Sequence, residues 1–67
     1  MLNVSVNGKT QQVPPGASVA DLVNDLSLQG KRFAVERNGE IVPKSTLTSV
    51  RLEDGDKLEV VVAVGGG

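Results

Sequence analysis

Few side chains in this sequence are suited to catalysis. The 67 residues include no cysteine and no histidine, so the sequence lacks the usual thiol nucleophile and the usual general base at neutral pH. Disulfides and metal sites built from thiolates or imidazoles are excluded for the same reason. The remaining candidates for chemistry are a lysine-containing turn, a group of carboxylates and the glycines that close the segment "VVVAVGGG".

The lysine-containing turn is Gly8-Lys9-Thr10, which resembles the end of a phosphate-binding P-loop. The first glycine of that motif would fall at position 3, where the sequence has Asn3, and a helix would have to begin directly after the motif. The sequence instead turns back into a strand pattern, so we predict a hairpin turn here and no nucleotide site.

The carboxylates Glu53, Asp54 and Asp56 could suggest a calcium site. An EF-hand loop spaces its oxygen ligands over a longer segment, and three carboxylates around one glycine lack that spacing. Asp and Gly are the residues that tight turns select. We therefore expect a solvated turn and no metal site.

The closing glycines, Gly65, Gly66 and Gly67, need another explanation. Glycine has no side chain to pack and loses more backbone freedom than any other residue, so three in succession do not stabilise a fold. One interpretation is that a function other than folding requires these glycines, and the other is a disordered end without a role.

Two hairpins are predicted in the part of the chain that would hold this tail. Residues 2–6 alternate apolar and polar side chains, as in a strand with one buried face, and Asn7-Gly8 tolerates the positive φ angles of a two-residue turn. The returning strand is expected over residues 9–13. The segment "FAVERNGEIV" repeats this pattern around Asn38-Gly39, and Pro43 ends it.

One helix is predicted to begin at Val19 and to stop at Gly30. Ser18 followed by Asp21 resembles a capping box, in which side chain and backbone satisfy each other at the start of a helix. The next apolar residues recur at helical spacing and should face a core. This apolar stripe comprises Val19, Leu22, Val23 and Leu26.

The last strand is predicted over residues 57–64, and its charges define its register. Lys57 and Glu59 must face solvent, because a slip of one residue would bury both. Val61 and Ala63 then share their outward face, beside the tail. We expect these two residues to form a docking surface, although single exposed apolar residues are common. The residues expected in the core are Leu58, Val60, Val62 and Val64.

Length and charge limit the remaining possibilities. The chain is long enough for one domain, here residues 1–64 followed by a flexible glycine tail over residues 65–67. A net charge of −1 without a basic run argues against nucleic-acid partners, and no apolar stretch approaches the roughly 20 residues that span a membrane. The sequence begins without a signal-peptide pattern, so a cytoplasmic location is expected.

The order of elements predicts an α+β fold, with a mixed sheet of four to five strands packed on one helix. This order resembles the β-grasp, or ubiquitin-like, fold. Within that group the chain resembles the ThiS-type sulfur carriers of thiamine biosynthesis in most of its length. The segments that carry the resemblance are "VNG", "SVADLV", "AVERNGEIVP", "LEDGD" and "VVAVGGG", of which the third and the last are the most specific.

The resemblance implies a protein cosubstrate rather than an enzyme. Members of the family end in a diglycine, which corresponds here to Gly66 and Gly67, with Gly65 as an additional glycine. In such carriers an E1-like adenylating enzyme of the ThiF type uses ATP and magnesium to adenylate the terminal carboxylate, here that of Gly67. Sulfur from a cysteine desulfurase system replaces AMP, and a thiazole synthase of the ThiG type takes the sulfur from the resulting thiocarboxylate.

The same resemblance implies that Gly65 and Gly66 enter the partner's active site and that the carrier itself binds no cofactor. Other functions remain open at this point. A molybdopterin-type carrier, or a carrier for another pathway, would share the terminal diglycine. A protein modifier would pass its terminus to lysines of other proteins, and a plain β-grasp interaction module would have no chemistry at all. One residue added after Gly67 should abolish carrier function and leave an interaction module unharmed.

Overall fold

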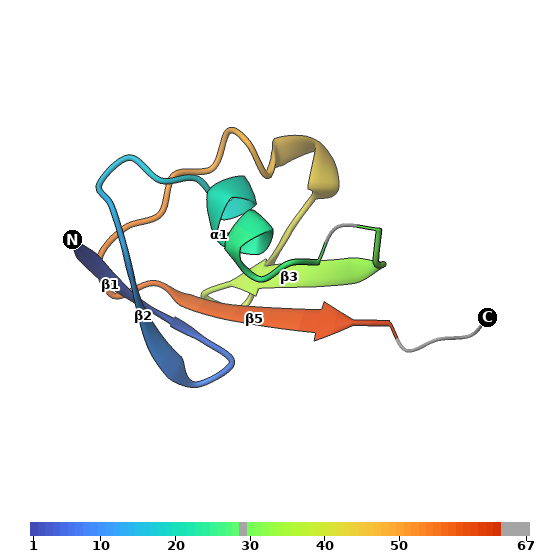
Figure 1. Ribbon diagram of the computed structural model, residues 1–67, viewed down its shortest axis with the longest axis horizontal. Coiled ribbons are helices and arrows are strands. Elements are labelled where there is room, and N and C mark those ends of the chain that lie inside the picture. Colours follow the sequence, from blue (N-terminus) through green and yellow to red (C-terminus); the bar gives the residue numbers. More distant parts are fainter. Residues whose placement is uncertain (29, 64–67) are drawn as a thin grey trace.

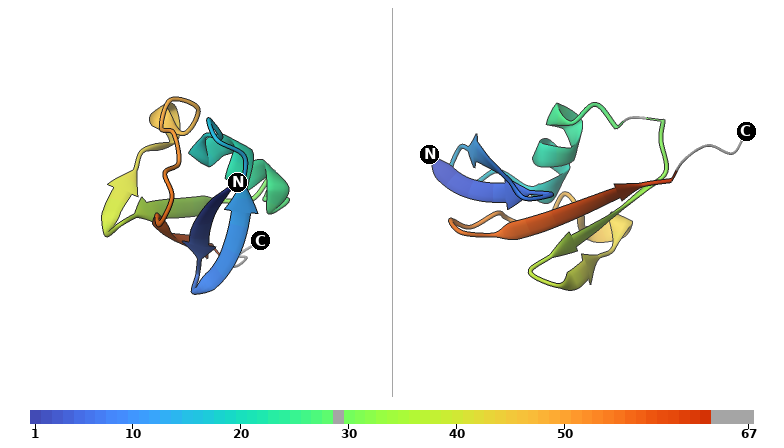
Figure 2. Two further views of the ribbon diagram at one scale, coloured as in Figure 1. Left: turned by 90° about the vertical axis from the view of Figure 1, so that its left-hand side faces the viewer. Right: turned by 90° about the horizontal axis from the view of Figure 1, so that it is seen from below.

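The computed structural model describes residues 1–28 and 30–63. In this part of the chain, five strands form one sheet, and the α-helix α1 (Val19–Asp25) covers one face of it (Figures 1 and 2). A short 3-10 helix, η1 (Lys44–Thr46), follows the fourth strand. The α+β architecture predicted from the sequence is confirmed. The strands are β1 (Leu2–Val6), β2 (Lys9–Val13), β3 (Phe33–Arg37), β4 (Glu40–Val42) and β5 (Lys57–Val62).

The last strand of the chain lies in the middle of the sheet, whose order is β2-β1-β5-β3-β4. β5 runs parallel to β1 and antiparallel to β3, while both hairpin pairs are antiparallel. The sheet is therefore mixed, as expected. The strand that precedes the closing glycines is thus paired with β3 over most of its length and with β1 at its start.

Both Asn-Gly turns connect the strands that the sequence predicted. Asn7 and Gly8 have φ angles of 51° and 85°, and Asn38 and Gly39 have 52° and 87°. Positive φ at both central positions gives a turn whose twist matches that of the flanking strands. Most residues avoid this conformation, whereas asparagine and glycine adopt it readily.

The helix begins as predicted and ends earlier than predicted. The backbone N–H of Asp21 donates to Ser18 Oγ at 3.1 Å, and the backbone N–H of Ser18 donates to Asp21 Oδ2 at 2.9 Å, which completes the capping box. α1 ends at Asp25, so the expected stop at Gly30 is wrong. Ser27 adopts a left-handed conformation, with φ of 57°, and already turns the chain away from the helix.

The core lies between α1 and the helix-facing side of the sheet and is built from aliphatic side chains. Val19 and Leu22 of α1 are 0% and 1% exposed, and they belong to the same cluster as residues of the three central strands. The residues of the three central strands that are 2% exposed or less are Val4, Val35 and Leu58.

In the part of the chain described here, no helix has the length and apolar content to cross a membrane.

The end of β5 is less buried than the sequence predicted. Leu58 and Val60 lie in the core as expected, but Val62 is 37% exposed. α1 is short, and Figure 1 shows β5 running past it, so the helix does not cover the last part of this strand. The predicted burial of Val62 is therefore wrong. Val64, predicted for the same face, lies outside the described residues.

The turn before β5 contains a buried carboxylate, contrary to the expected solvated turn. Asp56 is 6% exposed and accepts hydrogen bonds from Arg37 Nε (2.9 Å), from Asn38 Nδ2 (3.1 Å) and from the backbone N–H of Glu53 (2.8 Å). Burial alone would raise the pKa of Asp56, but these hydrogen bonds and the Arg37 charge outweigh it and lower the pKa. Glu53 and Asp54 are exposed, as predicted.

Candidate functional site

The closing glycines, of which Gly67 is expected to react, follow the last described residue, Ala63, after one further residue, Val64. Gly65, Gly66 and Gly67 lie outside the described residues. The structure describes the segment from which they continue, namely the end of β5 and Ala63. Figure 1 shows that β5 points away from α1 and from the hairpin of β1 and β2. We refer to residues 61–63 as the tail base.

β3 holds the tail base along its whole length. Val62 lies opposite Phe33 and Val61 lies opposite Ala34 in the antiparallel register. The backbone N–H of Ala63 donates to the Arg32 carbonyl at 2.9 Å, which extends the pairing by one residue beyond both strands. The position of the chain is thus defined as far as Ala63.

On its other side, β5 is held only as far as Val60. The parallel register with β1 ends at Val6 opposite Leu58, and Asn7 then turns away into the hairpin. The Asn7 side chain continues the pairing, because its Oδ1 accepts from the backbone N–H of Val60 (2.8 Å) and its Nδ2 donates to the Val60 carbonyl (3.1 Å). In the described part of the chain, the tail base therefore extends past β1 and has β3 as its neighbouring strand.

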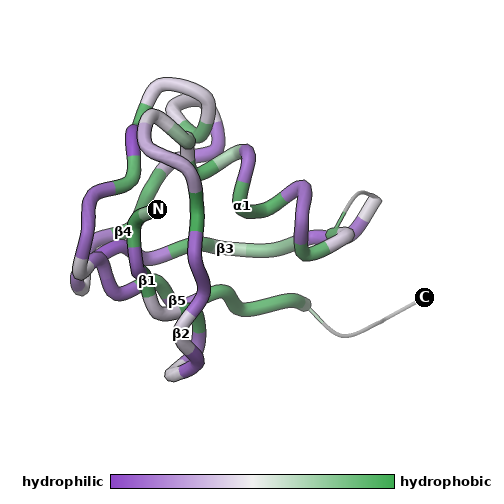
Figure 3. Tube along the Cα trace, turned by 60° about the vertical axis from the view of Figure 1, so that its left-hand side comes forward, coloured by the Kyte–Doolittle hydropathy of each residue, from purple (hydrophilic) through white to green (hydrophobic). Residues whose placement is uncertain are grey.

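Two apolar residues of the tail base face away from the helix, as the sequence predicted. Val61 is 65% exposed, and Ala63 is also exposed. Figure 3 shows that β5 becomes hydrophobic toward its end, where the charged residues of its first half give way to valines. Apolar surface is therefore accessible directly beside the start of the tail.

Sequence reasoning missed two further apolar residues on the same outward face. Ala34 lies directly opposite Val61 and is exposed. Ile41 of β4 lies opposite Glu36 and is 64% exposed. The signal was present, because a two-residue turn at Asn38-Gly39 fixes which residues of the two strands stand opposite each other.

No binding site for a metal is built from the described residues. Within residues 1–28 and 30–63, no three carboxylate or other metal-ligating side chains gather around one point. The most connected carboxylate, Asp56, is engaged by Arg37 and by its own turn, at the opposite end of β5 from the tail base.

Comparison with known proteins identifies the family. The sequence profile of the ThiS family matches residues 4–67. The sulfur carrier protein ThiS of Bacillus subtilis is 42% identical over 50 residues, which cover 75% of this chain and 76% of that protein. An uncharacterised protein of Pyropia yezoensis, ycf40, is 36% identical over 66 residues and is covered to 93%.

A longer relative contains a segment that is similar to almost the whole chain. The thiazole synthase of Paramagnetospirillum magneticum is 41% identical over 66 residues, which are 98% of this chain. The chain spans only 20% of the length of that thiazole synthase, so the similarity concerns one segment of it.

The three-dimensional comparison agrees with the sequence comparison. The crystal structure of the thiamine biosynthesis protein ThiS from Geobacter metallireducens superimposes with a TM-score of 0.80 at 32% identity, covering 98% of this chain and all of that one. The β-grasp fold expected from the sequence is thereby confirmed. The chain belongs to the ThiS family, the sulfur carriers of thiamine biosynthesis, which are cosubstrates of enzymes rather than enzymes themselves.

Proposed function

We propose that this chain carries sulfur as a thiocarboxylate on Gly67. An E1-like adenylating enzyme of the ThiF type activates the Gly67 carboxylate with ATP and magnesium, which belong to that enzyme and not to the carrier. A cysteine desulfurase system supplies the sulfur. The observation that carries this proposal is the ThiS family match, which continues through residue 67 and so includes all three closing glycines.

The activation step is required by the chemistry of carboxylates. A carboxylate is a poor electrophile, because its negative charge is shared by both oxygens and repels a nucleophile. When a Gly67 oxygen attacks the α-phosphorus of ATP, pyrophosphate leaves and a mixed anhydride with AMP forms. The terminal sulfur of a persulfide then attacks the carbonyl carbon, AMP leaves with that oxygen, and an acyl disulfide forms. A thiol must reduce the S–S bond of this acyl disulfide to release the thiocarboxylate, and the thiol and the persulfide carrier leave joined as a disulfide. The final product has sulfur in place of one carboxylate oxygen.

We propose a thiazole synthase of the ThiG type as the enzyme that takes the sulfur. The support is the similarity of this chain to a segment of two thiazole synthases, those of Paramagnetospirillum magneticum and Magnetococcus marinus. A carrier segment joined to its acceptor enzyme would raise the local concentration of the reactive tail. For the separate chain, docking would serve the same purpose. We place these reactions in the cytoplasm, where ATP is supplied.

We propose that residues 1–64 form the body that docks and that Gly65, Gly66 and Gly67 form the tail that enters the partner. Docking through Val61 and Ala63 would bury apolar surface that is now exposed. Ala34 and Ile41 enlarge this outward apolar surface, so we include them in the docking face. Docking would thus hold the tail base at the entrance while the glycines reach the nucleotide.

The position of the reacting carboxylate can be tested by adding one alanine after Gly67. We expect the extended chain to fold normally and to lose the ATP–pyrophosphate exchange that the adenylating enzyme catalyses, because the carboxylate is displaced by one residue, about 3.3 Å in an extended chain. The control is an alanine inserted before Met1, which should leave exchange unchanged. Normal exchange with the C-terminally extended chain would contradict the assignment to Gly67.

A further inference from the structure

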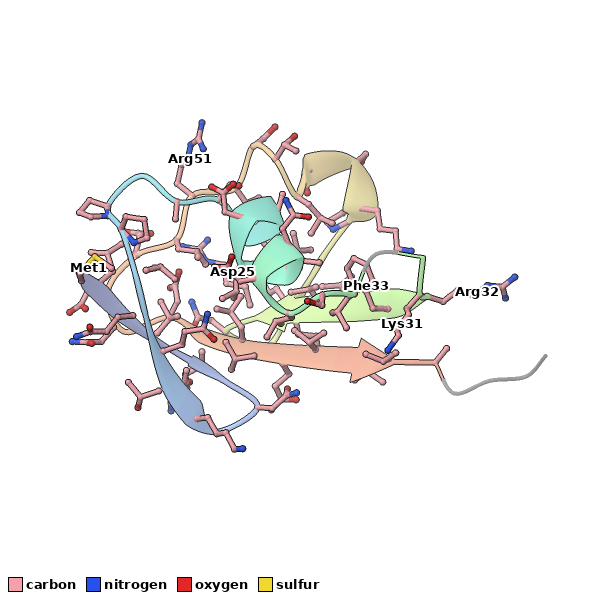
Figure 4. The ribbon with its side chains drawn as sticks, viewed as in Figure 1. Met1, Asp25, Lys31, Arg32, Phe33 and Arg51 are labelled. Atoms are coloured by element: carbon pink, nitrogen blue, oxygen red, sulfur yellow. The ribbon has the colours of Figure 1, made fainter. Side chains whose placement is uncertain are left out.

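Three cationic residues lie at the same end of the molecule as the tail base: Lys31, Arg32 and Lys44, which we call the basic rim. Lys31 and Arg32 directly precede β3, and the Arg32 carbonyl accepts the hydrogen bond from Ala63 at 2.9 Å. Figure 4 shows both side chains at the end of the molecule toward which β5 points, with Arg32 projecting outward. These two charges therefore stand beside the last described residue.

The third cation is held at the same end by an aromatic ring. Lys44 Nζ lies 4.8 Å from the centroid of the Phe33 ring, close enough for a cation–π interaction. Phe33 is the residue of β3 that lies opposite Val62. Lys44 of η1 thus contacts the residue that pairs with Val62 of the tail base.

The charges of the basic rim are not neutralised within the described part of the chain. All three residues are exposed, and both salt bridges among the described residues involve Arg37, with Glu53 and Asp56 as its partners. This acidic turn lies before β5, whereas the rim lies at its end. Among the described residues, the three rim cations therefore have no salt-bridge partner, in a chain whose net charge is only −1.

We propose that the basic rim binds an acidic surface around the entrance through which the adenylating enzyme takes the tail. This inference rests on the proposed function. Gly67 follows Ala63 by four residues, which span about 13 Å when extended, so the rim would face the protein surface around the entrance rather than the nucleotide inside. Charges in such a position act chiefly on the rate and orientation of encounter.

The test is the association rate constant with the adenylating enzyme of the same organism, measured by stopped flow at several NaCl concentrations. The variant is Arg32→Glu, and the matched control is Arg51→Glu, which reverses the charge of another exposed arginine far from the tail base (Figure 4). Arg32→Lys keeps the charge. Circular dichroism of each variant verifies the fold, which the exposed Arg32 side chain should not affect.

We expect Arg32→Glu to lower the association rate constant about three- to tenfold at low salt, since steering by charge is worth a factor of this order or more. Arg51→Glu should change it less than about twofold, and Arg32→Lys should match the unmodified protein. The difference should vanish in 1 M NaCl, where the Debye length is about 3 Å. At saturating enzyme, the yield of thiocarboxylate should be equal for all variants.

Other results would overturn the proposal. If Arg32→Glu and Arg51→Glu associate equally fast while the unmodified chain is adenylated, the rim has no role in encounter and the proposed function stands. If Arg32→Glu associates normally but is adenylated slowly at saturation, the cation acts inside the active site and the entrance is the wrong location. If the unmodified chain is not adenylated at all, the rim proposal and the proposed function both fail.

Discussion

At the scale of single residues, Asp56 connects the β3–β4 hairpin to the turn before β5. Its carboxylate accepts hydrogen bonds from Arg37, the last residue of β3, from Asn38 in the β3–β4 turn and from the backbone N–H of Glu53 in its own turn. Hydrogen bonds to a charged group contribute more to stability than those between neutral groups. The second salt bridge of Arg37, to Glu53, is different. The Glu53 side chain is 77% exposed, and such exposed ion pairs contribute little to the stability of the fold.

Replacing Asp56 by Asn should lower the free energy of unfolding by about 1–3 kcal/mol at neutral pH, because the charged acceptor for Arg37 is lost. The pKa of Asp56 is lowered by folding, so its contribution is complete above the unfolded-state value of about 3.9 and is lost as the pH falls through the folded-state value. The stability gap between the two proteins should therefore narrow in acid.

Urea unfolding at neutral pH and near pH 2 measures this gap. Glu53→Gln is the control, since removing the exposed carboxylate should cost less than about 1 kcal/mol at neutral pH. A gap of equal size at both pH values would show that the charge of Asp56 has no part in the stability of the folded state.

Val61 is the residue through which the docking face can be tested. Replacing the exposed Val61 by Glu places a charge in the centre of the proposed contact, so binding to the adenylating enzyme should weaken about tenfold or more. Gln12→Glu adds the same charge on the same face of the sheet in the edge strand β2 and should have little effect. Calorimetric binding constants that are alike for the two variants would remove Val61 from the docking face.

At the scale of elements, α1 depends on its cap and on its packing. A helix of seven residues is too short to form alone, so its start must be fixed by contacts. Ser18 is 4% exposed and takes part in both hydrogen bonds of the capping box. Ser18→Ala should therefore destabilise the fold by about 0.5–2 kcal/mol.

Thermal unfolding of Ser18→Ala measures this loss, with Ser45→Ala in η1 as the control at an exposed position. Ser18→Ala should unfold at a lower midpoint temperature than the unmodified protein, and Ser45→Ala should have the same midpoint as the unmodified protein. Equal midpoints for all three proteins would show that packing alone fixes the start of α1.

The elements also show what local sequence can predict. Both Asn-Gly turns and the capping box lie where the sequence placed them, because their φ angles and hydrogen bonds are properties of a few adjacent residues. The end of α1 and the burial of Val62 were predicted incorrectly. Both depend on how far the helix extends over the sheet, which is a tertiary property that no local pattern contains.

The sequence also predicted some features of the tail end and of the turn before β5 correctly and missed others. The outward direction of Val61 follows from the alternation of β5, and its exposure confirms that prediction. The buried Asp56 was missed, because its partner Arg37 is remote in sequence and the pattern "EDGD" is also typical of a solvated turn. The basic rim requires the pairing of Arg32 with Ala63, which only the assembled sheet provides.

At the scale of the whole molecule, the fold holds the tail base at one end of a small domain built around one sheet. β5 is the central strand, with the core on one side and an outward face that ends in apolar residues. The family match continues through the glycines at positions 65–67. This arrangement suits the proposed carrier function, in which the body docks while Gly67 reacts inside a partner.

The most direct test of this account is the intact mass of the chain after incubation with ATP, the adenylating enzyme and a sulfur donor. We expect an ATP-dependent gain that corresponds to one oxygen replaced by sulfur, located at Gly67 by fragmentation. The same mixture without ATP should give no gain. If the chain keeps its mass with an enzyme that is demonstrably active on another carrier, Gly67 does not carry sulfur as proposed.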